Sequence, residues 1–116
     1  MNKSIIDFCI LFYTIQMLTI YTTQLFDRWF SALKDKPSAR RIQVRIDRAE
    51  EGHLGDHKFV GQGVWEMRLH HGPGFRVYFM LRGEEMVILL AGGDKSSQVK
   101  DIETAQQLVR ELKDLA

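Results

Sequence analysis

The 116-residue sequence is poor in cysteine and has no large excess of either charge. A single cysteine, Cys9, excludes an internal disulfide, which fits a protein of the reducing cytosol. Lys and Arg number 16 and Asp and Glu number 15, so the net charge of +1 does not argue for nucleic-acid binding, and any basic surface must be local. The histidines lack cysteines or paired carboxylates at metal-ligand spacing, so the sequence predicts neither a metal site nor another cofactor.

The motifs of two common enzyme classes are also absent. There is no Gly-x-Ser-x-Gly elbow and no Ser/His/Asp spacing, so acyl transfer is not supported. The string GGDKS at 92–96 is similar to part of a phosphate-binding loop, but the first glycine of that spacing is missing. Nucleotide hydrolysis is therefore not indicated either.

The first 16 residues, MNKSIIDFCILFYTIQ, are apolar but match neither a signal peptide nor a membrane span. Asp7 interrupts the run, no small-residue cleavage site follows, and the run is too short to cross a bilayer. We expect residues 1–16 to be an N-terminal extension, either disordered or docked as an extra strand or helix, and residues 17–116 to form one domain. We also expect a cytoplasmic protein with no membrane partner.

From Thr23 onward the apolar spacing is helical. Residues 25–33 place Leu, Phe and Trp side chains on one face, with Thr23 as the N-cap. Pro37 separates this helix from a second one at 39–49 that ends near Gly52, and together they predict an αα-hairpin. The outer face of the second helix carries four arginines, Arg40, Arg41, Arg45 and Arg48. They form a solvated surface, a patch that faces phosphate, or a docking surface for an acidic partner.

The strand patterns lie mainly between residues 58 and 91. Apolar and polar residues alternate over 65–70 and 75–80, which predicts a hairpin with one face on a core and one polar face. The apolar run 86–91 predicts a strand covered on both faces, and Ser96 or Ser97 is expected to cap a closing helix. With a first strand after Met17, the order β-α-α-β-β-β-α predicts an α+β fold, an antiparallel sheet packed against a helical hairpin and a C-terminal helix.

The connection between the two hairpin strands is constrained by face parity. Arg68 and Arg76 share the polar face only if they pair directly or at an even offset, which requires an odd number of loop residues. We therefore expect a connection of three or five residues, with Gly72 or Gly74 at positive φ.

Most of the polar side chains that could carry chemistry lie on this hairpin. The set comprises Glu66, Arg68, His70, Arg76 and Tyr78 on the hairpin, and Lys95 after the third strand. Two adjacent arginines repel each other unless something negative lies between them. A phosphate would bind both arginines; alternatively, Glu66 pairs with one of them, or both are solvated.

Metal-free RNA cleavage is chemically compatible with this set. It requires a group that activates the 2′-hydroxyl, cations that stabilise charge on phosphorus, and an acid for the leaving oxygen. Arg68, Arg76 and Lys95 can supply the cations. His70 or Tyr78 can transfer a proton, and Tyr78 is equally able to stack on a base.

Three strings resemble a known family. FDRWFSALKD (26–35), GDHKFVGQGVWEMRLHHGPGFRVYF (55–79) and LLAGGDKSSQVKDIETA (89–105) resemble the HigB-like "addiction module killer" branch of the RelE/ParE toxin superfamily. The resemblance covers roughly residues 17–115. It implies the RelE/ParE-like fold and the toxin of a type II toxin–antitoxin module, a ribosome-dependent and metal-independent mRNA endonuclease that inhibits translation. It also implies a helix-turn-helix, HigA-like antitoxin that neutralises the toxin and carries it to operator DNA.

The resemblance assigns roles to individual residues. Arg76 matches the superfamily arginine that holds the scissile phosphate, Arg68 lies where mRNA-cleaving relatives have a basic strand residue, and Lys95 falls near their basic residue after the last strand. Glu66 stands where those relatives have a lysine, and no tyrosine follows Gln98. We expect Arg76 to be an exposed strand residue that contributes little to stability. The expected RNA-binding residues are Lys58, Arg40, Arg41, Arg45, Arg48 and Gln98.

Two other functions remain open for this fold. One is a DNA gyrase inhibitor like the ParE toxins, which needs no RNA-cleaving residues. The other is a non-catalytic module that binds its antitoxin and acts as a co-repressor. A fold resemblance alone does not choose among these functions, because function depends on the site.

Overall fold

The computed structural model describes residues 17–115, so the expectation for residues 1–16 lies outside the described range. The elements are β1 (Thr19–Thr22), α2 (Gln24–Ser31), α3 (Lys36–Glu50), β2 (His57–Gly61), β3 (Val64–Arg68), β4 (Arg76–Arg82), β5 (Met86–Gly93), a 3₁₀ turn (Lys95–Ser97) and α4 (Gln98–Leu115). The α+β class and the order of elements predicted from the sequence are confirmed. The short piece expected near residues 58–60 is strand β2.

The five strands form one sheet in the order β1-β5-β4-β3-β2. Strands β2 to β5 are antiparallel to their neighbours, but β1 pairs with β5 in parallel, so the prediction of a purely antiparallel sheet was wrong. The side-chain pattern of an edge strand shows which side chains face the core and does not show the direction of pairing. The backbone N–H of Thr23 donates to Leu89 at 3.1 Å and its hydroxyl to Leu90 at 2.7 Å, which fixes the end of β1 beside β5.

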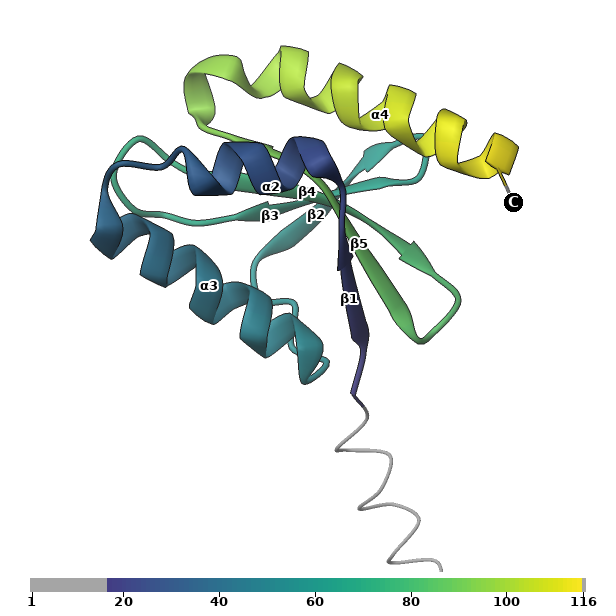
Figure 1. The fold of residues 1–116 in the computed structure, drawn as a ribbon, viewed down its shortest axis with the longest axis horizontal. Coiled ribbons are helices and arrows are strands. Elements are labelled where there is room, and N and C mark those ends of the chain that lie inside the picture. Colours follow the sequence, from purple (N-terminus) through teal and green to yellow (C-terminus); the bar gives the residue numbers. More distant parts are fainter. Residues whose placement is uncertain (1–16, 116) are drawn as a thin grey trace, which may run out of the picture.

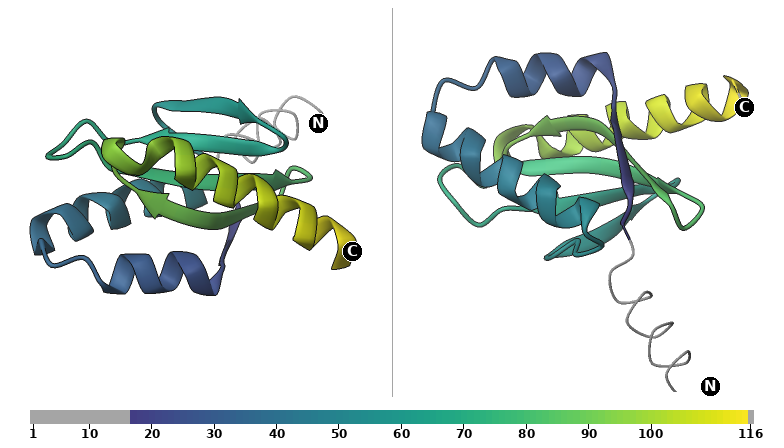
Figure 2. Two further views of the ribbon diagram at one scale, coloured as in Figure 1. Left: turned by 90° about the horizontal axis from the view of Figure 1, so that it is seen from above. Right: turned by 60° about the horizontal axis from the view of Figure 1, so that its bottom comes forward.

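Helices cover both faces of the sheet, α2 and α3 on one and α4 on the other (Figures 1 and 2). Met67, Val77 and Phe79 pack against the helical hairpin. On the opposite face, Val64 and Tyr78 pack with residues of α4. The expectation that only one face of the hairpin lies on a core was therefore wrong, because α4 packs on the second, polar face.

Strand β5 is buried on both faces, as its unbroken apolar run predicts. Val87 and Leu89 belong to the core under α2 and α3, whereas Ile88 and Leu90 belong to the core under α4. Beyond this run the sheet needs a residue without a side chain, because the ring of Trp29 lies where a Cβ of Gly92 would be. The glycine thus allows α2 to approach the end of β5 closely.

The ends of α2 and α3 follow the sequence signals. Thr23 caps α2, its side chain accepting from the N–H of Phe26 at 3.1 Å, and Pro37 lies in the first turn of α3. Gly52, with φ of 91°, follows the end of α3. A 3₁₀ turn capped by Asp94, which accepts from the N–H of Ser96 at 2.8 Å, precedes α4. Ser97 directly precedes Gln98, the first residue of α4, and its hydroxyl donates to Asp101 at 2.5 Å. The serine cap of the closing helix stays a prediction.

The connection between β3 and β4 has the predicted parity. Arg68 pairs directly with Arg76, and the N–H of Leu69 still donates to Phe75 at 2.9 Å, which leaves five residues, 70–74, in the turn. Gly72 and Gly74 both have positive φ, 57° and 76°. The odd loop length required by the two arginines is thus confirmed.

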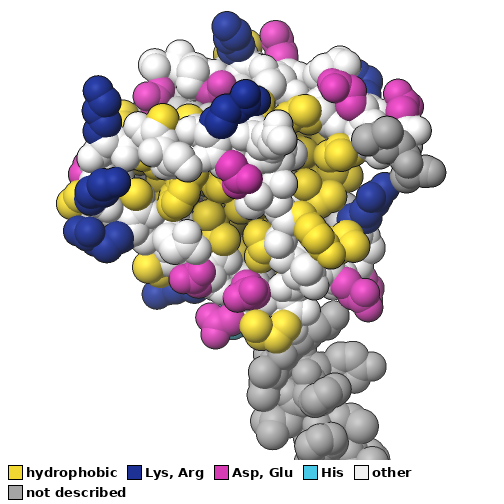
Figure 3. Space-filling view, in the orientation of Figure 1, with side chains coloured by type: hydrophobic (Ala, Val, Ile, Leu, Met, Phe, Trp, Pro, Cys, Tyr) yellow, Lys and Arg dark blue, Asp and Glu magenta, His cyan; other side chains and the backbone are white. Residues whose placement is uncertain are grey.

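One face of the molecule exposes hydrophobic side chains. Figure 3 shows them across the middle of this face, on both sides of α2, and one group lies where Figure 1 places α4 above β1 and β5. A groove of about 800 Å³ lies there, lined by residues of β1, α2, β4, β5 and α4. It reappears below.

A pair of leucines tests the assignment of the core. Leu89 is fully buried and Leu81 is 37% exposed, on neighbouring strands of one sheet. We expect Leu89→Ala to lower the free energy of unfolding by about 2–5 kcal/mol, because it removes buried methyl groups and leaves a cavity. Leu81→Ala is the matched control and should change it by no more than about 1 kcal/mol. Urea denaturation measures both, and equal losses would contradict this placement of the core.

Candidate functional site

A row of polar residues crosses the end of the sheet where β3 ends and β4 begins. Arg68 on β3 lies directly opposite Arg76 on β4, and Arg76 lies opposite Gly93 on β5. On the outer side, the N–H of Arg68 donates to the carbonyl of Asp56 at 3.0 Å, so Asp56 extends the row. The two arginines predicted to share a face are therefore nearest neighbours.

Arg68 shares its carboxylate partner with a histidine. Its Nη2 donates to Oδ1 of Asp56 at 3.2 Å, and Nε2 of His70 lies 2.5 Å from the other oxygen, Oδ2. The Arg68 side chain is 34% exposed and that of His70 is 78% exposed. The hydrogen bond with His70, and next those of Arg68, hold the pKa of the Asp56 carboxyl below its usual range. This carboxylate therefore stays ionised in neutral solution.

Arg76 is held more deeply than the sequence suggested. Its side chain is 14% exposed, with Nε 3.5 Å from Oε2 of Glu66 and Nη1 donating to the carbonyl of Gly74 at 2.6 Å. Glu66 is only 1% exposed and also accepts from Nε2 of Gln98 at 2.8 Å. The expectation of an exposed Arg76 was wrong. Because its removal would leave a buried carboxylate without a cation, we now expect substitution of Arg76 to lower stability.

Lys95 approaches the row from the loop after β5. Its backbone N–H donates to the carbonyl of Pro73 at 3.3 Å, and its Cβ lies close to Gly74, the residue that also holds Arg76. The Lys95 side chain is exposed. Arg68, Arg76 and Lys95 thus come from three separate stretches of chain to one end of the sheet.

Tyr78 does not join this exposed group. It is fully buried beneath α4, and its hydroxyl makes no hydrogen bond within the described part of the chain. Burial, and then the neighbouring carboxylate of Glu66, raise the pKa of the Tyr78 hydroxyl far above its usual range. In this structure Tyr78 is not accessible to a base or to a reacting hydroxyl.

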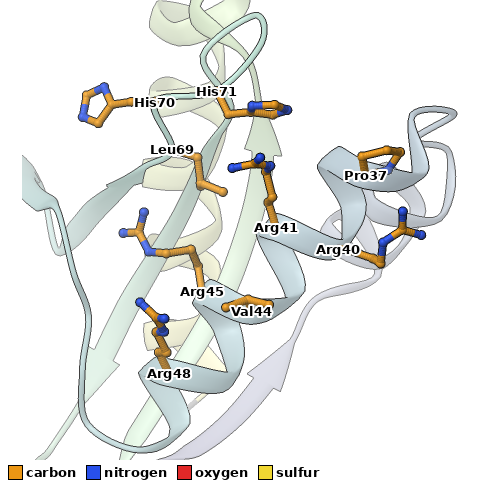
Figure 4. A pocket seen from close by; sticks show the side chains of 9 residues that line it. All are labelled: Pro37, Arg40, Arg41, Val44, Arg45, Arg48, Leu69, His70 and His71. Atoms are coloured by element: carbon orange, nitrogen blue, oxygen red, sulfur yellow. The ribbon is translucent and has the colours of Figure 1, made fainter.

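The α3 arginines line a second feature, a groove of about 550 Å³ between α3 and the β3–β4 turn (Figure 4). We call it the arginine groove. Its lining residues are Pro37, Arg40, Arg41, Val44, Arg45, Arg48, Leu69, His70 and His71. Arg40, Arg41 and Arg48 are exposed, and no carboxylate is among the lining residues. His70 belongs both to this groove and to the pair with Asp56, so the groove and the arginine row adjoin.

Arg45 differs from the other three arginines, because it is a structural clamp. Its Nη1 donates to the carbonyl of Arg68 at 2.6 Å, and its Nη2 donates to the carbonyls of Leu54 and Asp56, both at 3.1 Å. It thereby ties α3 to the segment before β2 and to the end of β3. Burial lowers the pKa of Arg45, an effect that nearby Asp56 opposes.

The remaining predicted site residues lie at the margins of the row. Lys58 is exposed on β2, opposite Glu66 on β3. Gln98 begins α4 and is engaged with Glu66. The sequence reasoning missed Asp56, which precedes β2 by one residue and contacts both Arg68 and His70. Its position after Gly55 marks a turn, but nothing in the sequence pattern places that turn beside the end of β3.

Among residues 17–115, no three histidine, cysteine, aspartate or glutamate side chains gather as a metal site would require. No helix in that range is both long and apolar enough to cross a membrane.

Comparison with known proteins shows the family to which the chain belongs. Residues 28–110 match the phage-derived protein Gp49-like family (DUF891), which is well over half of the chain. The chain belongs to the Gp49-like family. An uncharacterized protein of Haemophilus influenzae is 45% identical to it over 95 residues, 82% of this chain and 96% of that protein. The Gp49-like family is a toxin-like family of the RelE/HigB type that is associated with toxin–antitoxin systems.

The Arg45 clamp provides a stability prediction. Arg45→Met keeps the length of the side chain but removes its three hydrogen bonds to carbonyl oxygens, so we expect a loss of about 1–3 kcal/mol in the free energy of unfolding. Hydrogen exchange should quicken at residues 54–57. The control is Arg48→Met on the exposed side of α3, which should stay within about 0.5 kcal/mol of the parent. Identical behaviour of the two variants would refute the clamp.

The Asp56 carboxylate provides a pH prediction. Because its pKa is lowered in the folded chain, its contacts with His70 and Arg68 are complete above the ordinary aspartate pKa and are lost as the pH falls through the folded value. NMR titration of the Asp56 carboxyl should give a midpoint below the usual value of about 3.9. His70→Ala should raise that midpoint, and His53→Ala, a change of another exposed histidine, should not. An unshifted midpoint in the parent chain would rule out the contact.

Proposed function

We propose that this Gp49-like protein is a toxin that cleaves mRNA on the ribosome, with Arg68, Arg76 and Lys95 around the scissile phosphate. The observation that carries the proposal is the direct pairing of Arg68 with Arg76 at the end of the sheet that Lys95 also reaches. Two paired guanidinium groups, with Lys95 following β5 at the same end of the sheet, suit an anion whose charge grows during the reaction. Membership of a toxin-like family supports the choice of RNA over other phosphate esters.

Each of the two arginines is paired with a carboxylate. Asp56 balances Arg68 and Glu66 balances Arg76. A bound phosphate is therefore not needed to keep the two arginines together. The carboxylates instead fix the guanidinium groups in place before substrate arrives, and this pre-organisation favours transition-state stabilisation. Nη2 of Arg76 makes no hydrogen bond to any described residue and remains a donor for the phosphate.

The proposed reaction is an internal transfer that needs no water and no metal. The 2′-oxygen forms a bond to the adjacent phosphorus while the bond from phosphorus to the 5′-oxygen of the next nucleotide breaks. One proton leaves the 2′-hydroxyl and one joins the departing 5′-oxygen. The products are a 2′,3′-cyclic phosphate and a free 5′-hydroxyl, so the reaction balances without a further reactant.

His70 is the group that we assign to take up the proton of the 2′-hydroxyl. Asp56 is ionised and can only accept, so it favours the tautomer in which Nε2 of His70 carries the proton. Nδ1 then has a free lone pair. The side chain is 78% exposed and can reach a bound strand. Tyr78 is the other proton-transfer candidate from the sequence. We assign it no role in proton transfer because it is buried.

The arginine groove is proposed to bind the flanking RNA backbone. Arg40, Arg41 and Arg48 are exposed there, and the groove adjoins the arginine row through His70. Lys58 and Gln98 flank the row on the other side. In the cell, we propose that cleavage inhibits translation in the cytoplasm and that a helix-turn-helix antitoxin of the HigA type neutralises the toxin and links it to operator DNA.

The variant that tests this function must keep the fold. Arg76→Lys retains a cation beside buried Glu66 but loses the planar fork that binds two oxygens. We expect its cleavage rate to fall by about 100-fold or more. The matched control is Arg82→Lys, at the other end of β4, which should cleave normally. The measurement is 5′-end mapping of a reporter mRNA translated with purified ribosomes and toxin.

Three outcomes would contradict the proposal. The first is wild-type toxin that produces no new 5′ ends within translated codons. The second is an Arg76→Lys variant that cleaves as fast as the control. The third is inhibition of gyrase supercoiling without RNA cleavage, which would assign the chain to the other activity of this fold.

A further inference from the structure

The groove shown in Figure 3 differs in chemistry from the arginine groove. It has a volume of about 800 Å³, and its floor is formed by Ile88 of β5 with Leu25 of α2 and Leu108 and Leu112 of α4. These side chains belong to the core under α4 or pack against it, so the groove is an opening of that core to the surface. Tyr21 on its margin is 48% exposed.

Such a surface suits a protein helix and not an RNA strand. Large apolar hollows on a folded chain are sites of protein association, because covering them removes apolar area from water. An RNA backbone needs cations along its path, whereas here leucine and isoleucine side chains form the floor. An amphipathic helix can bury a row of apolar side chains, spaced at i, i+3, i+4 and i+7, in a groove of this kind.

The charges beside the groove define the partner further. Arg28 of α2 and Arg82 of β4 both line it, both are exposed, and neither forms an ion pair within residues 17–115. No carboxylate is among its lining residues. A helix with acidic residues beside its apolar row would therefore be complementary in charge as well as in polarity.

The groove lies away from the arginine row. Arg76 and Arg82 mark opposite ends of β4, six residues apart along an extended strand, which corresponds to roughly 20 Å. A helix in the groove would thus leave Arg68, Arg76 and Lys95 uncovered. The two surfaces can be tested separately.

We propose that this apolar groove is the docking site for an acidic amphipathic helix of a partner protein. The partner is taken to be the antitoxin, an identification that rests on the proposed toxin function and on the family's association with antitoxins. The apolar row of the helix packs on Leu25, Ile88 and Leu108, and its acidic residues face Arg28 and Arg82. Tyr21 lies at the rim as an aromatic anchor.

Two double variants that each reverse the charge of two exposed arginines test the proposal. The Arg28→Glu/Arg82→Glu double variant reverses two exposed charges beside the apolar groove. The Arg40→Glu/Arg48→Glu double variant reverses two exposed charges in the arginine groove and is the matched control. Calorimetry with the purified product of the reading frame next to this gene, the proposed antitoxin, should show affinity lower by about tenfold or more for the first variant. The control should bind within about twofold of the parent.

Hydrogen exchange on the full chain provides the second measurement. Adding the antitoxin should slow exchange at residues 21–28, 82–88 and 108–112, and not at 40–48 or 70–71. The proposal would be overturned if the antitoxin affinity fell equally in both double variants, fell in the control alone, or fell in neither. Protection confined to the arginine groove would also overturn it. So would concentration-dependent dimerisation of the toxin alone that the Arg28→Glu/Arg82→Glu change abolishes, because a second copy would then fill the groove.

Failure of this docking site is distinguishable from failure of the proposed function. The Arg28→Glu/Arg82→Glu variant contains no residue of the arginine row, so it should cleave mRNA at the parental rate while escaping the antitoxin. A toxin that binds its antitoxin at the groove but never cleaves RNA would overturn the proposed reaction and leave the docking site intact.

Discussion

The candidate site depends on one buried carboxylate. Glu66 is 1% exposed, and a lone charge at that depth would cost several kcal/mol without partners. Arg76 lies beside it and Gln98 donates to it, so strand β4 and the start of α4 are both tied to β3 through one side chain. Arg76 is positioned by its pairing with this buried carboxylate. The geometry of the arginine row follows from that pairing.

The same logic is repeated at the more exposed end of the row. Asp56 receives Arg68 and His70, and Arg45 fixes the backbone of Asp56 from the opposite face of the sheet. The chain therefore uses an arginine from α3 to position the loop that positions an arginine and a histidine on β3. The carboxylates of Glu66 and Asp56 thus determine the positions of the basic residues in the arginine row. The outer edge of the fold, at the other end of β4, is left with an apolar opening and two exposed arginines.

Local patterns in the sequence predicted the helices and strands. Pairing between distant segments determines which side chains are buried and which lie together in the site. Parity alone placed Arg68 opposite Arg76, because the side-chain alternation of a strand has a strict period of two. The same alternation carries no sign that α4 covers the second face. It therefore predicts an exposed Tyr78 and an exposed Arg76, whereas Tyr78 is buried and Arg76 is nearly so. The parallel pairing of β1 and the contact of Asp56 with Arg68 and His70 depend on segments far apart in the chain, for which a single sequence carries no local signal.

Whether the arginine row receives the scissile phosphate is decided by a structure of this protein on a ribosome. The mRNA would carry a single 2′-deoxy nucleotide at the cleavage position, which removes the attacking hydroxyl and traps the complex. The account predicts the phosphate that follows this nucleotide within hydrogen-bond distance of Arg76, with Arg68 beside it and His70 facing the 2′-carbon. An mRNA phosphate held only in the arginine groove, or a toxin bound with its arginine row facing away from mRNA, would contradict it.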